Sequence, residues 1–186
     1  RVVNFAHGEL VMVGAFTVWL LHAQFGLGYI PALGAAIILV TSIGLVMERI
    51  LFRPTRSDPL AGLICSIGVL FILQVIAAVI GGDGPSKQVP PPYHGTLILF
   101  DMIRVPYQRV FSLVISSSAL IALWFFLTRS KFGWALRAVA MDREAASLQG
   151  IDANKISIIA IGVGAALAGL AGGLIAPLGN INPHMG

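Results

Sequence analysis

The sequence is poor in charged residues and contains a single cysteine. Aspartate, glutamate, lysine and arginine make up 11% of the 186 residues, whereas hydrophobic residues make up 57%. Because a soluble domain is about one-quarter charged, this composition excludes an ordinary water-soluble fold. Cys65 has no second cysteine in the sequence with which to form an intramolecular disulfide. The composition therefore indicates an integral membrane protein.

The sequence also lacks the motifs of the common enzyme classes. The four histidines lie far apart, so no metal-ligand spacing is present. The segment GGDGPSK at 81–87 lacks the Gly-Lys-Ser/Thr ending of a phosphate-binding loop. No nucleophile can be paired with a base, and basic residues are not interleaved with aromatics as on a nucleic-acid surface. We expect no catalytic residue, no metal, no cofactor and no nucleic-acid partner.

Long apolar runs dominate the sequence instead. Four runs contain no Asp, Glu, Lys or Arg, and a fifth near the start has His22 as its one ionisable group besides tyrosine. Each approaches the about 20 residues that a helix needs to cross a membrane, and open strand edges cannot be satisfied in lipid. The predicted fold is an all-α, polytopic transmembrane helix bundle surrounded by membrane lipid. Its five spans are 9–25, 30–48, 60–81, 110–128 and 156–177.

Basic residues gather in two loops, one after the second predicted span and one after the fourth. They are Arg49, Arg53 and Arg56 in the first loop and Arg129, Lys131, Arg137, Arg143 and Lys155 in the second. An even number of crossings separates the loops, so the positive-inside rule assigns both to the cytoplasm. The proline-rich loop 82–109 is then external. We interpret it as a stiff connector, with contact to an external partner as the alternative.

The second basic loop, 129–155, contains the pattern of a short amphipathic helix. On a helical wheel its apolar stripe consists of Ala138, Met141, Ala145 and Leu148. We expect one helix that ends at Gly150, where the left-handed cap conformation costs little, and Asp152 as the cap of the next helix. Because the stripe has no Trp or Phe anchor, a groove on a partner protein is favoured over the lipid surface.

A polar cluster of Asn4, His7 and Glu9 precedes the first apolar run. A carboxylate at the membrane edge is costly unless it caps a helix, pairs or faces water. One interpretation places Glu9 in a first helical turn, where the helix dipole stabilises it. The other makes the cluster the lining of a substrate pathway at a broken helix, which Gly8 permits. Other polar candidates within the spans, Ser66, Gln74 and Ser116–Ser118, are too few to specify a ligand.

Small residues recur every four positions in the last predicted span. One row consists of Ala165, Gly169 and Gly173, and the other of Ala168, Gly172 and Ala176. Such rows let another helix approach closely. Ordinary packing within the bundle is one interpretation, and a surface that slides during gating is the other.

Four segments resemble, in this order, the permease subunits of branched-chain amino acid ABC importers. They are NFAHGELVMVGAF at 4–16, GGDGP at 81–85, FGWALRAVAMDREAASLQGID at 132–152 and ALAGLAGGLIAPL at 166–178. The resemblance covers essentially the whole chain, and its first and third segments are the specific ones.

This resemblance implies a multi-pass subunit of the bacterial inner membrane. Its partners would be a second permease subunit, two cytoplasmic ATPase subunits that use ATP, and a periplasmic substrate-binding protein. In such importers a Glu-Ala-Ala motif with a downstream glycine docks onto the ATPase. Here the ATPase-coupling residues would be Arg143, Glu144, Ala145, Ala146 and Gly150. The later Ile and Leu-Pro of the general importer pattern are not cleanly present.

The predicted function is ATP-driven import of leucine, isoleucine and valine by a chain that is not itself an enzyme. Permeases for urea or short-chain amides are the alternative, and a passive channel without an ATPase contact is a further one. The sequence begins without methionine and without a secretory signal. We therefore expect it to be part of a longer permease.

Overall fold

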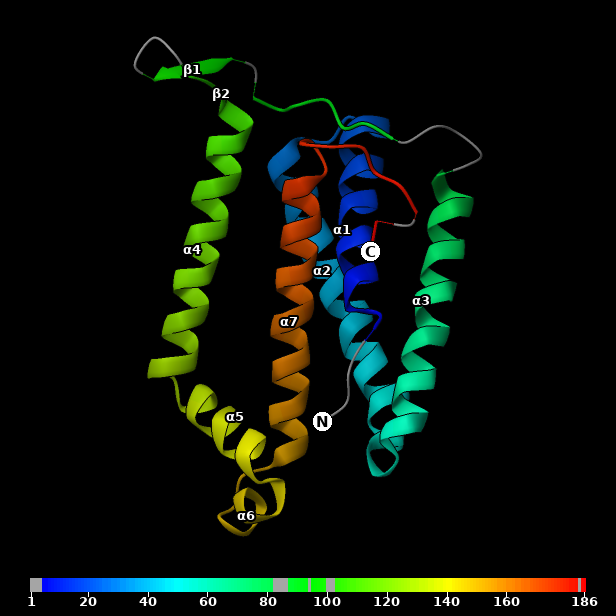
Figure 1. The fold of residues 1–186 in the computed structure, drawn as a ribbon, viewed down its shortest axis with the longest axis vertical. Coiled ribbons are helices and arrows are strands. Elements are labelled where there is room, and N and C mark those ends of the chain that lie inside the picture. Colours follow the sequence, from blue (N-terminus) through cyan, green and yellow to red (C-terminus); the bar gives the residue numbers. More distant parts are fainter. Residues whose placement is uncertain (1–4, 82–86, 94, 100–102, 184) are drawn as a thin grey trace.

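The protein is described by a computed structural model that covers residues 5–81, 87–93, 95–99, 103–183 and 185–186. Its long apolar segments form helices that run roughly along one axis (Figure 1). The helices are α1 (His7–Val18), α2 (Tyr29–Met47), α3 (Pro59–Gly81), α4 (Tyr107–Arg129), α5 (Lys131–Met141), α6 (Arg143–Leu148) and α7 (Ala153–Ile175). The predicted all-α, polytopic bundle is therefore confirmed.

Shorter elements continue or connect these helices. The π-helical turns η1 (Trp19–Gln24) and η2 (Glu48–Phe52) extend α1 and α2, and the 3-10 turn η3 (Pro54–Ser57) leads into α3. Between α3 and α4, the strands β1 (Thr96–Leu99) and β2 (Ile103–Pro106) form an antiparallel hairpin in which Thr96 pairs with Pro106. The stretch interpreted as a connector thus contains a small hairpin.

Four helices in the described part of the chain are long and apolar enough to cross a membrane: Tyr29–Phe52, Leu60–Gly81, Tyr107–Arg129 and Ala153–Ile175. The first predicted span, 9–25, differs. It lies in α1 and η1, a short helical segment whose ends carry the polar residues His7, Glu9, His22 and Gln24. These residues lower its hydropathy, and much of its apolar surface is buried against other helices.

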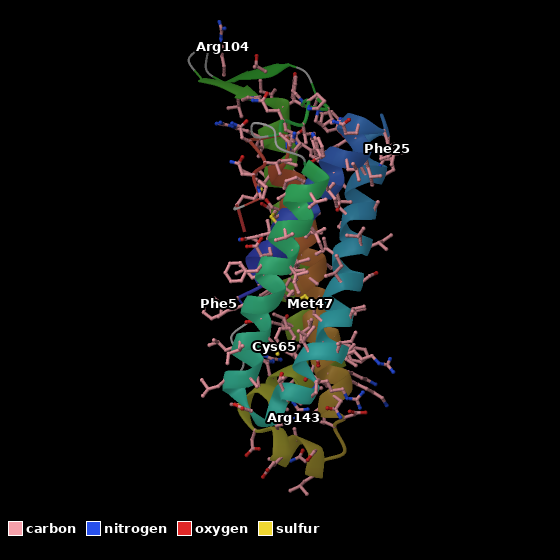
Figure 2. All side chains as sticks on the ribbon, turned by 90° about the vertical axis from the view of Figure 1, so that its right-hand side faces the viewer. Phe5, Phe25, Met47, Cys65, Arg104 and Arg143 are labelled. Atoms are coloured by element: carbon pink, nitrogen blue, oxygen red, sulfur yellow. The ribbon has the colours of Figure 1, made fainter. Side chains whose placement is uncertain are left out.

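The two basic loops lie at the same end of the molecule. Figure 1 shows α5, α6 and the turn after α2 at one end and the β1–β2 hairpin at the other. In the orthogonal view, Arg143 and Arg104 mark these opposite ends (Figure 2). This is the arrangement that the positive-inside argument requires.

The core lies where α1, α2 and α7 pack against one another, and the small residues of α7 allow them to approach closely. One row, consisting of Ala165, Gly169 and Gly173, faces α2. A Cβ added to Gly169 would lie 3.0 Å from Val40 Cβ, and one added to Gly172 would collide with the carbonyl oxygen of Val11 in α1. Helices α3 and α4 stand at opposite edges of the bundle and expose most of their surface (Figure 1).

Candidate functional site

The carboxyl group of Glu9 is buried inside the bundle. Glu9 lies in the first turn of α1 and is 1% exposed. The side chain of Gln74 in α3 donates a hydrogen bond from Nε2 to Glu9 Oε1 at 2.8 Å. Glu9 Oε2 has no hydrogen-bond partner among the residues that the structure describes. The N-terminal end of α1 and the hydrogen bond from α3 both stabilise a negative charge on this carboxyl group. Its Oε2 atom can still accept a further hydrogen bond.

The start of α1 lies at the middle of the bundle rather than at its edge. Figure 1 shows α1 beginning about halfway along α7. On α3, two helical turns before Gln74, buried Ser66 accepts a hydrogen bond from the backbone N–H of Phe5 at 3.4 Å. A helix that begins at mid-depth directs its N-terminal dipole into the interior, as the half-helices of transporters do.

His7, which the sequence places in the same polar cluster, does not join this arrangement. His7 is exposed, and its ring atom Cε1 lies 3.9 Å from where a Cβ on Gly164 of α7 would be. Asn4 lies outside the described residues. The structure therefore brings Glu9 together with Gln74, a pairing that sequence reasoning missed. A single amide in the apolar run of α3 was the available signal, but hydropathy does not say which helix it faces.

A second buried polar group near the outer end of the bundle was also missed. The hydroxyl of Tyr29 in α2 donates to the carbonyl oxygen of Gly173 in α7 at 2.9 Å, and Gln108 Nε2 of α4 donates to the Tyr29 hydroxyl at 3.4 Å. Gln108 is 2% exposed. These bonds connect three helices at the end that carries the β1–β2 hairpin.

The cytoplasmic loop contains two helices, so the prediction of one continuous amphipathic helix is wrong. Asp142 adopts an extended conformation with φ −148°, and α5 ends before it. Its Oδ1 accepts hydrogen bonds from the backbone N–H groups of Glu144 at 2.9 Å and Ala145 at 3.0 Å. This N-cap starts α6 and breaks the predicted apolar stripe between Met141 and Ala145.

Helix α6 ends where the sequence predicts. Gly150 has φ +81°, its N–H donates to the Ser147 carbonyl at 3.0 Å, and the N–H of Ile151 donates to the Ala146 carbonyl at 3.1 Å. This pair of bonds is a Schellman motif around a left-handed glycine.

Asp152 then caps α7, also as predicted, by accepting from the N–H groups of Lys155 at 3.2 Å and Asn154 at 3.0 Å. The hydrogen bond from the Lys155 backbone is the main cause that lowers the pKa of Asp152. Arg143 also donates to Asn154 Oδ1 at 2.9 Å. The two ends of α6 are thus both connected to the start of α7.

The loop presents two large apolar side chains to its surroundings. Met141 is 91% exposed and Leu148 is 89% exposed. Between them along the chain, Arg143, Glu144 and Ala145 are exposed, whereas Ala146 is buried. Such an apolar and charged tip has the composition of a protein contact.

No group of three or more His, Cys, Asp or Glu side chains within the described residues could hold a metal ion.

Comparisons with known proteins find similarity to membrane permease proteins. The high-affinity branched-chain amino acid transport system permease protein BraD of Pseudomonas aeruginosa is 32% identical over 99% of this chain and 64% of its own length. LivH of Escherichia coli, with the same printed description, has the same identity and coverage. The guanosine ABC transporter permease protein NupQ of Bacillus subtilis is 30% identical over 94% of this chain and 58% of its own length.

The chain thus spans about 64% of the length of the first two relatives. No solved structure matches it. All of its residues, 1–186, match the family described as branched-chain amino acid transport system / permease component. The chain therefore belongs to this family of permease components.

Proposed function

We propose that the chain is part of a membrane-spanning permease subunit that imports leucine, isoleucine and valine across the bacterial inner membrane with energy from ATP. The match of the whole chain to the permease family carries this proposal. The spans Tyr29–Phe52, Leu60–Gly81, Tyr107–Arg129 and Ala153–Ile175 supply a membrane domain, and no catalytic group is needed within it.

The partners in this proposal are a second permease subunit, two cytoplasmic ATPase subunits and a periplasmic binding protein. ATP is used by the ATPase subunits, so the permease needs no cofactor of its own. The proposed ATPase contact is the exposed tip formed by Met141 and helix α6, which ends at Leu148. The proposed coupling residues are Arg143, Glu144, Ala145, Ala146 and Gly150. Its apolar side chains fit a groove on a partner protein.

Movement of this tip has a short route into the bundle. The cap at Asp152 and the hydrogen bond from Arg143 to Asn154 connect α6 to the first turn of α7. Helix α7 in turn contacts α1 and α2 through glycine surfaces with little free space. ATP-driven displacement of α6 would therefore move α7 relative to α1 and change which end of the pathway is open.

In this account the pathway passes the start of α1, with Asn4, His7 and Glu9 as its candidate residues. The Oε2 atom of Glu9, which lacks a hydrogen-bond partner among the described residues, and the hydroxyl of Ser66 on α3 support a polar point on this pathway. A carboxyl oxygen is suited to accept a hydrogen bond from the ammonium group of an amino acid.

Import of a nucleoside is the second candidate function, because one relative of similar identity is described as a guanosine permease. An ATPase assay of the reconstituted complex distinguishes amino acid import from nucleoside import. The rate of ATP hydrolysis is measured with the binding protein loaded in turn with leucine, guanosine, urea or a short-chain amide. We expect leucine to stimulate hydrolysis most. Stimulation by guanosine or urea but not by leucine would refute the amino acid assignment.

A further inference from the structure

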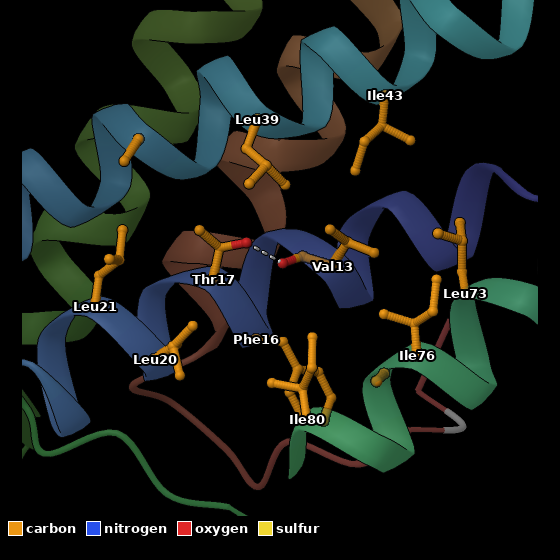
Figure 3. A pocket seen from close by; sticks show the side chains of 12 residues that line it. Val13, Phe16, Thr17, Leu20, Leu21, Leu39, Ile43, Leu73, Ile76 and Ile80 are labelled. Carbon is orange, nitrogen blue, oxygen red and sulfur yellow. Dashed lines mark hydrogen bonds between the residues drawn. The ribbon is translucent and has the colours of Figure 1, made fainter.

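The exposed side of α5 combines an aromatic ring with two cations. Trp134 is 64% exposed, and the guanidinium carbon of Arg137 lies 4.5 Å from the centre of its ring. Lys131, which is also exposed, precedes Trp134 by three positions as Arg137 follows it by three, so the three side chains are neighbours on the helix. The groove between α1, α2 and α3, in contrast, is lined by side chains without charge (Figure 3). The surface of α5 therefore suits a ligand with both apolar and anionic parts.

A tight turn holds the start of α5 against the end of α4. The backbone N–H of Gly133 donates to Ser130 Oγ at 2.9 Å, and the Ser130 hydroxyl donates to the carbonyl oxygen of Phe126 at 2.6 Å. A Cβ on Gly133 would collide with the carbonyl oxygens of Phe126 and Leu127. Gly133 thus lies beside two residues of the span Tyr107–Arg129. The first turn of α5 is therefore at the level where this span leaves the membrane.

Aromatic side chains on α4 mark the same level. Trp124 and Phe125 are exposed, and their ring centres are 5.1 Å apart in an edge-to-face arrangement. Along the helix, Trp124 is about 7.5 Å from Arg129, the last residue of the span, at 1.5 Å per residue. Tryptophan is enriched where the hydrocarbon of a membrane meets the lipid headgroups. The exposed tryptophans of α4 and α5 therefore both indicate this boundary.

The charges on this part of the chain suit an anionic surface. The sequence has no aspartate or glutamate from residue 107 to residue 141. Arg129, Lys131 and Arg137 are exposed, and among the residues that the structure describes no carboxylate lies within 4 Å of their cationic groups. In α6, by comparison, one arginine is balanced by one glutamate. Cations next to the cytoplasmic end of a membrane helix attract anionic lipids, so α5 has the charge for such a contact and α6 does not.

The break at Asp142 separates α5 and α6 in depth as well. Helix α5 packs against α4 and α7, whereas α6 lies beyond the ends of the spanning helices (Figure 1). The aromatic residues Phe132 and Trp134 are both in α5, and α6 contains none. The lack of a Trp or Phe anchor, which favours a protein groove over lipid, therefore applies to α6 and not to α5.

We propose that α5 lies in the headgroup region of the cytoplasmic leaflet and binds anionic phospholipid there. Lys131 and Arg137 are the phosphate-binding groups, and the Trp134 ring lies at the top of the acyl chains. Contact with this ring holds the Arg137 guanidinium in place, while its N–H groups can donate to phosphate oxygens. The membrane then fixes α5 while α6 moves about Asp142, a consequence that rests on the proposed function.

Photo-crosslinking tests the position of the lipid directly. The assembled permease complex is placed in vesicles that contain phosphatidylglycerol with a photoreactive group near its phosphate, and the crosslinked residues are identified by mass spectrometry. We expect crosslinks within residues 131–138 and none within 143–148. Crosslinks confined to other surfaces, or as frequent on α6 as on α5, would overturn the proposal. So would a photoreactive amino acid in place of Trp134 that crosslinks to an ATPase subunit instead of lipid.

Variants test the role of charge at the same site. The measured quantity is the fraction of phosphatidylglycerol in the vesicles that gives half of the maximal crosslinking to residues 131–138. We expect Lys131→Gln and Arg137→Gln each to raise this fraction about fivefold, the contribution of one cation at an anionic surface, and to leave crosslinking by a phosphatidylcholine probe unchanged.

Arg143→Gln is the matched control, because it removes an exposed cation from α6 in the same loop. We expect this variant to require the same fraction of phosphatidylglycerol as the wild type. An unchanged requirement in both Lys131→Gln and Arg137→Gln would contradict the assigned phosphate contact. An equal increase in Arg143→Gln would show that the charge of the whole loop, and not a site on α5, attracts the lipid.

Discussion

At the residue scale, the buried carboxyl group of Glu9 must find in neighbouring protein groups the hydrogen bonds that water would otherwise provide. A carboxyl group that is 1% exposed loses its hydration, and in return it gains the N-terminal end of α1 and one hydrogen bond from Gln74. Because the free Oε2 atom is not satisfied by any described residue, the site is only partly compensated. Gly186 also packs against this carboxyl group, because a Cβ on Gly186 would lie 2.6 Å from Glu9 Oε2.

Replacing Gln74 with leucine tests this requirement. Leucine is similar in size to glutamine but has no hydrogen-bond donor, so the Glu9 carboxyl group loses its partner. We expect a loss of about 1–3 kcal/mol in the free energy of unfolding in detergent, together with reduced leucine uptake. Gln88→Leu is the control, because Gln88 is exposed and its partner Asn180 is not buried in the core. Equal unfolding free energies for the two variants would contradict the role of the Glu9–Gln74 bond.

At the element scale, the cytoplasmic tip is determined by two capping residues. The periodicity of apolar residues continues through Asp142, so a helical wheel predicts one helix. The carboxylate of Asp142 competes with that continuation because it satisfies the N–H groups of the following turn. Gly150, in contrast, could be predicted as a helix end, because glycine adopts the left-handed backbone conformation at a helix C-terminus at the lowest energetic cost. The outcome is a six-residue helix, α6, held between two turns.

Gly150→Val should uncouple ATP hydrolysis from uptake. A β-branched residue at φ +81° is strained, so the end of α6 would rearrange and shift the proposed ATPase contact. We expect a multifold loss of leucine uptake per ATP hydrolysed in reconstituted vesicles, with normal insertion into the membrane. Gly34→Val is the matched control, because both glycines have open space where a Cβ would lie but Gly34 does not have a positive φ. A normal ratio in Gly150→Val would contradict the coupling assignment.

The glycine surface of α7 gives a second test at this scale. Gly172→Ala would place a Cβ against the carbonyl oxygen of Val11, whereas the nearest neighbour of a Cβ on Gly164 is a His7 atom at 3.9 Å. We expect Gly172→Ala to lower the unfolding free energy by about 1–3 kcal/mol through overpacking, and Gly164→Ala to have little effect. Thermal unfolding of the two variants in the same detergent measures the difference, and equal midpoints would contradict the close packing of α1 and α7.

At the scale of the whole molecule, the sequence predicts where the membrane-spanning helices lie along the chain, but it does not predict which faces of these helices contact one another. The predicted spans 30–48, 60–81, 110–128 and 156–177 fall within a few residues of helices that could cross a membrane. Uninterrupted hydropathy determines those segments because lipid contact imposes it. Contacts such as Tyr29 with Gly173 depend instead on which faces meet after folding, and composition within a span does not report that.

ATP-driven accumulation of leucine tests the central claim of this account most directly. The complete permease with its ATPase and binding-protein partners is reconstituted into sealed vesicles, and radiolabelled leucine is measured inside and outside over time. We predict that leucine becomes more concentrated on the side of the membrane opposite the binding protein only while ATP is hydrolysed, and that this accumulation stops without ATP. Leucine that equilibrates to equal concentrations at the same rate with or without ATP would identify a passive channel and contradict the account.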